Sequence, residues 1–404
     1  MFATHHSIER PSRIDGLQLL AVLGLMLISV TFVYSATMVG ESARTFLWYH
    51  QLYFKQIIWF ALGLSATTAV CVTDYHALSR WSLVVYWISI LLLVVVLIPG
   101  IGVTHGGARR WINLGSFLLQ PSEFAKLAFI LAEAAFLSRP VDELRQSGVF
   151  WKAISLMALP FLLIMKEPDL GSALLLVPTG MVMLFVAGTP KRYLLRLIGG
   201  GMVLGALLLV NVLFAPPGWW KIKLEDYQRD RLMVYFGKSF VPANASAAEE
   251  KNARRLQDDK SYQGKQALIS VGSGGLFGRG WHNGNQTRLG FLPRGAAHTD
   301  FIFSVIAEEE GFVGSVVVLT LYAVILFTGI RIAGQARDRL GKLLAVGVVT
   351  LLFSHVFINI GMNIRIMPVT GVPLPLLSYG GSSVVGSLIA MGLLQNVYIY
   401  RKAY

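Results

Sequence analysis

The chain has 404 residues, of which 54% are hydrophobic and only 14% are charged, and its mean hydropathy is +0.60. This composition excludes an ordinary soluble protein and predicts repeated membrane spans. The net charge of +13 would suggest nucleic-acid binding in a soluble protein, but the apolar runs leave no soluble domain for that role. The single cysteine, Cys71, excludes an intramolecular disulfide.

Apolar runs of about 20 residues recur along the chain, and we expect about ten transmembrane helices from them. These runs begin near Gly16, Phe54, Trp81, Pro121, Trp151, Leu170, Tyr193, Asp300, Lys342 and Ser382. We therefore predict an all-α polytopic membrane protein with a single membrane domain over residues 1–404.

The basic residues of the short loops set the expected orientation, because they favour the cytoplasmic side. They gather on the side of the N-terminus and include Arg80, Arg145, Lys191, Arg192 and Arg339. Both termini are then predicted to be cytoplasmic. Residues 215–299 form a large extracytoplasmic loop between the seventh and eighth spans.

The stretch 266–303 is glycine-rich and polar, and it ends with His298 and Asp300 at the start of the eighth span. An ionisable group at the membrane is costly and suggests a function. Partial desolvation would raise the pKa of Asp300 and make it a better proton acceptor near neutral pH. The alternative is an N-cap, for which aspartate is also favoured.

Three adjacent carboxylates, Glu308, Glu309 and Glu310, follow in the same apolar segment. They fan around a helix, so they cannot all face lipid. We favour hydrated outer turns of the helix that end at Gly311. The alternative is that one carboxylate faces a cavity and helps to bind a cation.

The stretch 107–126 combines basic groups with a helix start. Arg109 and Arg110 stand beside the interfacial Trp111, and Pro121 suits the first position of a helix. An exposed helix N-terminus with cations nearby is a good site for a pyrophosphate. The alternative role of the arginines is to anchor lipid headgroups.

Two acidic–basic pairings are possible along the next part of the chain. Glu123 and Lys126 have the i, i+3 spacing of an ion pair, although a lysine in a membrane segment also suggests a function. Glu167 and Asp169 flank the helix-breaking Pro168. They are expected to cap the next helix, to pair with Lys126, or to bind a divalent cation such as Mg or Mn.

Five separated motifs carry a family resemblance, and they run in order from about Asp15 to the C-terminus. They are RRWINLG with QPSEFAK, EPDLGSAL, YQGKQALISVGSGGLFGRGW, LGFLP with HTDFIFSVIAEEEG, and PVTGVPLPLLSYGGSS. Together they resemble the SEDS family (shape, elongation, division and sporulation), which includes FtsW, RodA and SpoVE. The GVPLPLLSYGGSS form is more similar to RodA than to the division homologue FtsW.

The resemblance implies a peptidoglycan glycosyltransferase of the bacterial inner membrane that polymerises lipid II during cell-wall elongation and rod-shape maintenance. It implies a class B penicillin-binding protein as the transpeptidase partner, together with other elongation-complex proteins. The family's proposed catalytic aspartate falls on Asp300. Its RW and QPSEFAK motifs place basic and acidic groups on Arg110, Glu123 and Lys126 and an aromatic one on Trp111, and His298 belongs to the same HTDF motif as Asp300.

One segment departs from the family pattern. The family usually reads FLP, then glutamate and one further residue, then HTDF, whereas this chain reads FLPRGAAHTDF. The chain therefore lacks that glutamate, has Arg294 there, and is two residues longer. We expect the approach to His298 to differ accordingly.

The expected chemistry is an inverting transfer with release of undecaprenyl pyrophosphate. Asp300 would take the proton of the acceptor sugar hydroxyl, and Arg109, Arg110, Lys126 or a divalent cation would stabilise the pyrophosphate. The alternatives are an FtsW-like septal polymerase, a lipid II flippase or transporter, and a non-enzymatic scaffold for the transpeptidase.

Overall fold

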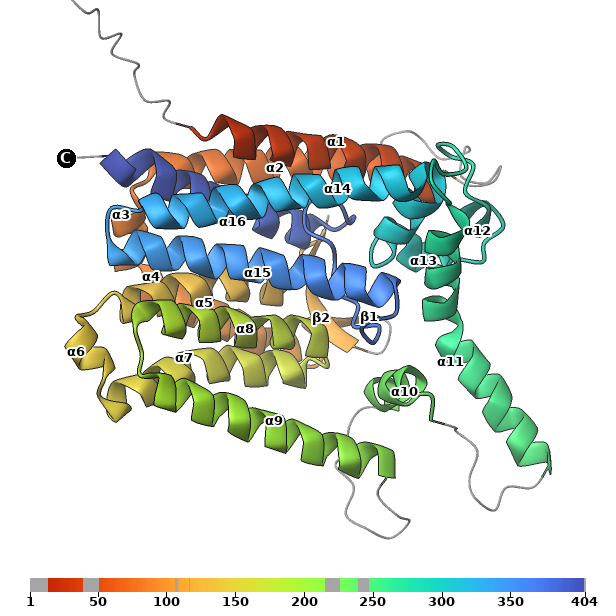
Figure 1. Ribbon diagram of the computed structural model, residues 1–404, viewed down its shortest axis with the longest axis horizontal. Coiled ribbons are helices and arrows are strands. Elements are labelled where there is room, and N and C mark those ends of the chain that lie inside the picture. Colours follow the sequence, from red (N-terminus) through yellow and green to blue (C-terminus); the bar gives the residue numbers. More distant parts are fainter. Residues whose placement is uncertain are drawn as a thin grey trace, which may run out of the picture.

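The computed structural model describes residues 14–38, 51–105, 108–115, 117–214, 226–238 and 247–402. Most of these residues form long helices that run side by side (Figure 1). Eight helices of the described ranges are long and apolar enough to cross a membrane: α1 (Gly16–Thr37), α2 (Leu52–Val72), α7 (Ser147–Lys166), α8 (Leu170–Ala187), α9 (Lys191–Phe214), α14 (Ile302–Gln335), α15 (Arg339–Asn363) and α16 (Gly381–Ile399). The predicted helical membrane architecture is therefore confirmed.

Two further helices occupy the remaining predicted positions. α4 (Ser82–Leu97) is a shorter apolar helix, and α5 (Pro121–Leu137) has 17 residues that are mostly buried. Both are near the length needed to cross the hydrocarbon core. The count of ten spans stays a prediction.

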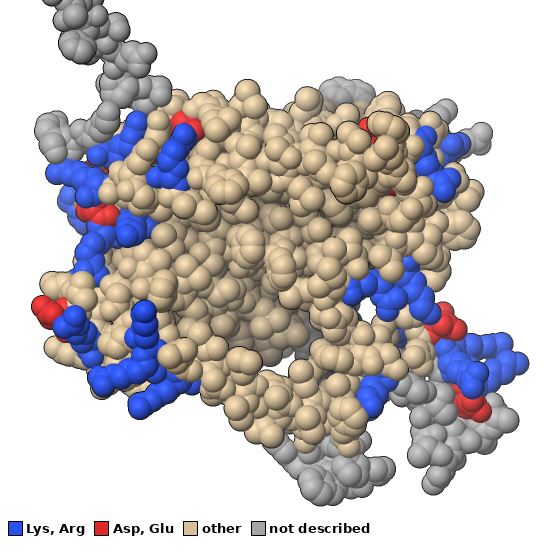
Figure 2. All heavy atoms as spheres, viewed as in Figure 1, with Lys and Arg blue, Asp and Glu red and all other residues tan. Residues whose placement is uncertain are grey.

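The surface divides into an apolar band and two charged ends. In Figure 2 the charged side chains gather at the two ends of the helices, and the broad band between them is almost free of charge. Large apolar side chains are exposed along this band, including Leu20, Leu195 and Phe327. Such a surface suits lipid and not water.

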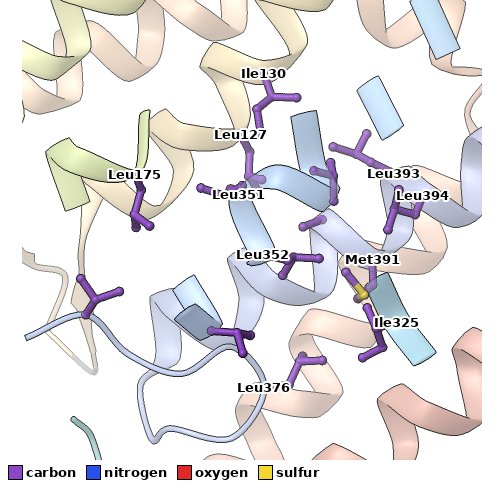
Figure 3. Packing of buried hydrophobic residues seen from close by; sticks show 14 of the residues in the cluster. Leu127, Ile130, Leu175, Ile325, Leu351, Leu352, Leu376, Met391, Leu393 and Leu394 are labelled. Carbon is purple, nitrogen blue, oxygen red and sulfur yellow. The ribbon is translucent and has the colours of Figure 1, made fainter. Parts of the chain in front are cut away.

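The buried core is centred on α15, which packs against α14, α8, α5 and α16. Figure 3 shows Leu351 and Leu352 of α15 among side chains from these neighbours, including Leu127, Leu175 and Leu394. Helix α9 lies outside this core: among its residues only Leu194 is buried. It runs along one edge of the bundle in Figure 1.

The remaining helices are α3 (Tyr75–Arg80), α6 (Val141–Leu144), α10 (Asp226–Tyr235), the longer α11 (Ala247–Ser273), α12 (Asn285–Arg288), α13 (Arg294–Ala297) and a 3-10 helix at Tyr400–Lys402. Helices α10 to α13 fall within the predicted large loop. α10 and α11 lie at the end opposite α3 and α6 (Figure 1), and α11 packs against α14.

A small antiparallel sheet precedes α5. Its strands are β1 (Gly102–His105), β2 (Ala108–Asn113) and β3 (Leu118–Leu119), in the order β1-β2-β3. We predicted no strand here. The glycines on either side of β2 are turn signals that could have revealed a hairpin.

Candidate active site

Asp300 lies just before α14, in a backbone segment that other parts of the chain hold in place. Its carbonyl accepts hydrogen bonds from the side-chain amides of Asn359, at 3.0 Å, and Asn363, at 3.1 Å, both on α15. Both asparagines are fully buried. The N-cap of α14 is Phe301, so the alternative that Asp300 is the cap is wrong.

The side chain of Asp300 shares a site with groups from distant parts of the chain. The charges that act on it come from Arg231 of α10, Arg110 of β2 and Asp169, the N-cap of α8. Gly371, in the loop between α15 and α16, lies next to both Asp300 and Arg231. A Cβ added to Gly371 would lie 3.6 Å from Asp300 Oδ2 and 3.9 Å from Arg231 Nη1.

The environment of Asp300 adjusts its basicity. Burial raises the pKa of Asp300 to about 6, while Arg231 and Arg110 lower it and Asp169 raises it further. At neutral pH the carboxylate is therefore mostly ionised, yet it is a stronger base than an ordinary aspartate. A group with such a pKa can accept a proton during a reaction near neutral pH.

Arg110 joins the sheet to the turn between α7 and α8. Its guanidinium donates to the carbonyls of Glu167, at 3.4 Å, and Pro168. Its Nη1 lies 3.7 Å from Asp169 Oδ1. The start of α8 in turn packs closely against the α15–α16 loop. Gly171 leaves no room for a larger residue there, since an added Cβ would lie 2.6 Å from the Val372 side chain. The fold thus brings Arg110 and Asp169 to Asp300.

The structure agrees with the capping interpretation of Asp169. Its Oδ1 accepts a hydrogen bond from the backbone amide of Ser172 at 3.2 Å, and its Oδ2 one from Gln120 at 3.3 Å. Glu167 is fully buried, and burial followed by the charge of Asp169 raises its pKa to about 9, although Arg110 lowers it. At neutral pH the Glu167 side chain is therefore protonated.

These two acidic residues do not fit a metal site held by the protein alone. Both oxygens of Asp169 are already engaged, and a divalent cation such as Mg needs several oxygen ligands. Within the described residues, no three or more His, Cys, Asp or Glu side chains group so as to hold a metal ion. Binding of a divalent cation at this turn stays a prediction.

Lys126 pairs with Glu123 as its spacing predicted, with the Nζ and Oε1 atoms 2.8 Å apart. The Nζ also lies 3.0 Å from His355 Nε2. However, Pro121, Glu123 and Lys126 are all buried. The expected exposed helix N-terminus is therefore wrong, because the sheet and α16 cover the start of α5.

The other predicted residues occupy separate positions. Arg109 turns back toward α4 and donates to the carbonyl of Leu97 at 3.2 Å. Trp111 lies in β2 opposite Val103. His298 is close to Asp300 in the chain, and its ring centroid lies 5.5 Å from that of Tyr379.

The expected hydration of Glu308 and Glu309 is wrong, since both are buried. The Glu308 carboxylate accepts hydrogen bonds from Ser270 Oγ at 3.1 Å and from the backbone amide of Gln286 at 3.0 Å. Glu309 accepts from Ser35 Oγ at 2.5 Å and from the His282 amide at 2.9 Å. The two carboxylates thus connect α14 to α1, to α11 and to the segment after α11.

Gly311 interrupts α14 where these carboxylates lie, with φ 66° and ψ −155°. The glycine-rich segment replaces the lost helical hydrogen bonds: the amide of Arg279 donates to the Glu308 carbonyl at 3.0 Å and that of Gly280 to the Glu309 carbonyl at 2.9 Å. The first part of α14, next to Asp300, is therefore fixed by this segment. Its glycines let the two backbones approach closely, because they have no side chain between them.

Two functional residue types escaped the sequence analysis. Arg231 has no motif around it, and only the fold shows that it reaches Asp300. Asn359 and Asn363 carried a usable signal, because two amides four residues apart on one face of an apolar helix need polar partners.

Comparisons with known proteins cover nearly the whole chain. A family model described as "Cell cycle protein", for FtsW, RodA and SpoVE, matches residues 16–403. The chain is 35% identical over 391 residues to peptidoglycan glycosyltransferase MrdB of Escherichia coli K12, which covers 96% of this chain and 94% of that protein.

Solved structures share the fold. One is a chain of a peptidoglycan synthase complex that coordinates polymerization and crosslinking, with a TM-score of 0.75, 28% identity, and coverage of 97% of this chain and 99% of that one. Another is the rod shape determining protein RodA of Thermus thermophilus, with a TM-score of 0.65, 27% identity, and coverage of 97% and 98%.

Proposed function

Because the chain belongs to the FtsW, RodA and SpoVE family of cell cycle proteins, we propose how its site around Asp300 performs glycosyl transfer. The chain is a multi-pass membrane protein and a peptidoglycan glycosyltransferase of the elongation type, like its MrdB and RodA relatives. The SEDS resemblance that its motifs carried is confirmed.

The proposed reaction is a single displacement on lipid II. The hydroxyl oxygen of the acceptor sugar attacks the anomeric carbon of the donor, and the bond from that carbon to the pyrophosphate breaks. Undecaprenyl pyrophosphate leaves with the bonding electrons, and Asp300 takes the hydroxyl proton. The observation that carries this proposal is a carboxylate at the start of α14 whose backbone carbonyl is held by the side-chain amides of α15 and which lies close to Arg231.

Arg110 and Arg231 would stabilise the negative charge that develops on the pyrophosphate, because guanidinium groups pair well with phosphate oxygens. Asp169 keeps Arg110 in position. Lys126 has a structural role in this proposal and does not contact the pyrophosphate. It is buried against Glu123 and His355 and supports the fold of α5. Binding of substrate by Arg109, Trp111 and His298 stays a prediction.

We place this site on the extracytoplasmic side of the bacterial inner membrane, with both termini in the cytoplasm. The positive-inside rule supports this orientation. A class B penicillin-binding protein, other elongation-complex proteins and the nascent glycan strand are the proposed partners. The relative found within a peptidoglycan synthase complex supports the first of these.

The test is the polymerisation of lipid II by the purified full-length protein, alone and with its transpeptidase, followed by separation of the glycan strands on a gel. We expect polymer that survives inhibition of the transpeptidase. Transfer of labelled lipid II across vesicle membranes without polymer would support a flippase instead. Neither polymer nor lipid transfer, with normal partner binding, would support a scaffold.

A further inference from the structure

A pocket of about 600 Å³ lies between the end of α8 and the start of α9. Asp169 caps the other end of α8, which has 18 residues and is therefore about 27 Å long. The pocket and the Asp300 site thus lie at opposite faces of the membrane. In Figure 2 basic side chains gather at the end of the molecule where α8 meets α9.

The lining of this pocket is basic. Arg145, Lys191 and Arg192 contribute to it, and none of its lining residues is acidic. The first turn of α9, which begins at Lys191, has no acidic residue either, and its helix dipole adds further positive charge. Arg339 lies close by and donates to the carbonyl of Ala187 at 2.8 Å.

The contacts that these cations make leave most of their charge uncompensated. Arg145 Nη1 lies 3.7 Å from Asp142 Oδ1, but the side chain of Asp142 is 93% exposed, and such surface pairs contribute little. Arg192 stacks on Tyr193, with 5.0 Å between its Cζ and the ring centroid. Clustered like charges at a membrane surface are stabilised by an anion.

Thr189 adds a hydroxyl donor to this lining. The residue is only 5% exposed and lines the pocket. A phosphate can accept from this hydroxyl together with the guanidinium and ammonium groups.

Beside the basic lining, the pocket opens on an apolar surface. Phe185 lines it and is 57% exposed. Leu195 and Ile198, in the first turns of α9, are 68% and 48% exposed. The ligand that suits both surfaces carries a phosphate at one end and hydrocarbon chains at the other.

We propose that this pocket binds the headgroup of an anionic phospholipid, with the phosphate held by Arg145, Lys191, Arg192 and Thr189. The acyl chains lie along Phe185 and α9. The lipid belongs to the leaflet opposite the Asp300 site, which is the cytoplasmic leaflet in the proposed orientation. This binding is independent of the glycosyl transfer reaction.

The experiment measures retained lipid on the purified full-length protein by native mass spectrometry, during titration with phosphatidylglycerol or with phosphatidylcholine. The test variant combines Arg145→Ala, Lys191→Ala and Arg192→Ala. The control variant, with the same change in net charge, combines Lys251→Ala, Arg254→Ala and Arg255→Ala on α11. A third variant, Arg145→Lys with Arg192→Lys, keeps the pocket charge.

We expect phosphatidylglycerol to bind more tightly than phosphatidylcholine. The test variant should weaken phosphatidylglycerol binding on the order of a hundredfold, since each basic group at a membrane surface contributes substantially. The control and the lysine variants should bind as the wild type does. Equal retention by the test variant and the control would overturn the proposal. Complete displacement of the lipid by inorganic phosphate would also overturn it, in favour of a free-anion site.

Discussion

Replacing Arg231 by glutamine tests the electrostatic coupling at the site. An added Cβ on Gly371 would lie 3.6 Å from Asp300 Oδ2 and 3.9 Å from Arg231 Nη1. The two charged groups are therefore at most about 7.5 Å apart. At an effective dielectric constant of about 20, their attraction is about 2 kcal/mol, which corresponds to about 1.5 pH units.

The sign of the effect follows from the charge. Arg231 lowers the pKa of Asp300, which burial raises to about 6. Loss of the guanidinium favours the protonated acid, so the pKa of Asp300 rises further. Since the base must be ionised to act, the polymerisation rate increases with pH through this pKa. The midpoint of that increase should move upward by about 1.5 pH units in Arg231→Gln.

The assay is the initial rate of lipid II polymerisation from pH 5 to pH 9, about the range over which the two midpoints can be separated. Arg229→Gln is the matched control, because this exposed arginine lies two residues away on the same helix and so points in another direction. A lower rate in Arg231→Gln with an unchanged midpoint would refute the electrostatic coupling between Arg231 and Asp300. Arg231 would then act only in substrate binding.

Three further predictions concern the supports of the site. Asn363→Ala removes a hydrogen bond to the Asp300 carbonyl and should lower the free energy of unfolding by about 1–3 kcal/mol, as measured by thermal melting in detergent; an unchanged melting temperature would contradict this role. Gly278→Ala places a Cβ 2.1 Å from the Glu309 carbonyl oxygen and should lower both the melting temperature and the rate, whereas Gly272→Ala, with open space around it, should not; equal effects would count against the role of the glycine-rich segment in fixing the first part of α14. Treatment with EDTA tests the cation predicted for the acidic turn before α8: we expect the rate to be retained, and its loss with recovery on adding Mg would show that the reaction uses a metal.

The helices could be predicted largely from the sequence, because bilayer thickness imposes a length that hydropathy reveals. The start of α5 at Pro121 and the pairing of Glu123 with Lys126 also followed from local rules. The burial of that pair did not, since it depends on α15 and α16 packing over α5. Local spacing fixes which groups meet on one helix but says little about what covers them.

The site was likewise predictable only where local sequence carries the signal. Asp300 stood out because a carboxylate beside an apolar helix is rare. Arg110 stood out as a basic residue beside an interfacial tryptophan, and Asp169 as a charge at a helix end. Their meeting depends on contacts such as Gly171 against Val372, which join segments far apart in the chain. Arg231 lies in a mixed-charge segment without periodicity or motif, so only tertiary structure shows its place.

The central claim is that Asp300 accepts the proton of the attacking hydroxyl. Asp300→Asn keeps the size of the side chain and its backbone contacts but cannot accept that proton. The direct measurement is the initial rate of lipid II polymerisation by this variant in complex with its transpeptidase, beside the exposed-site control Asp259→Asn. The account predicts a loss of at least about a hundredfold in Asp300→Asn alone, and a folded Asp300→Asn protein that polymerises at the control's rate would contradict it.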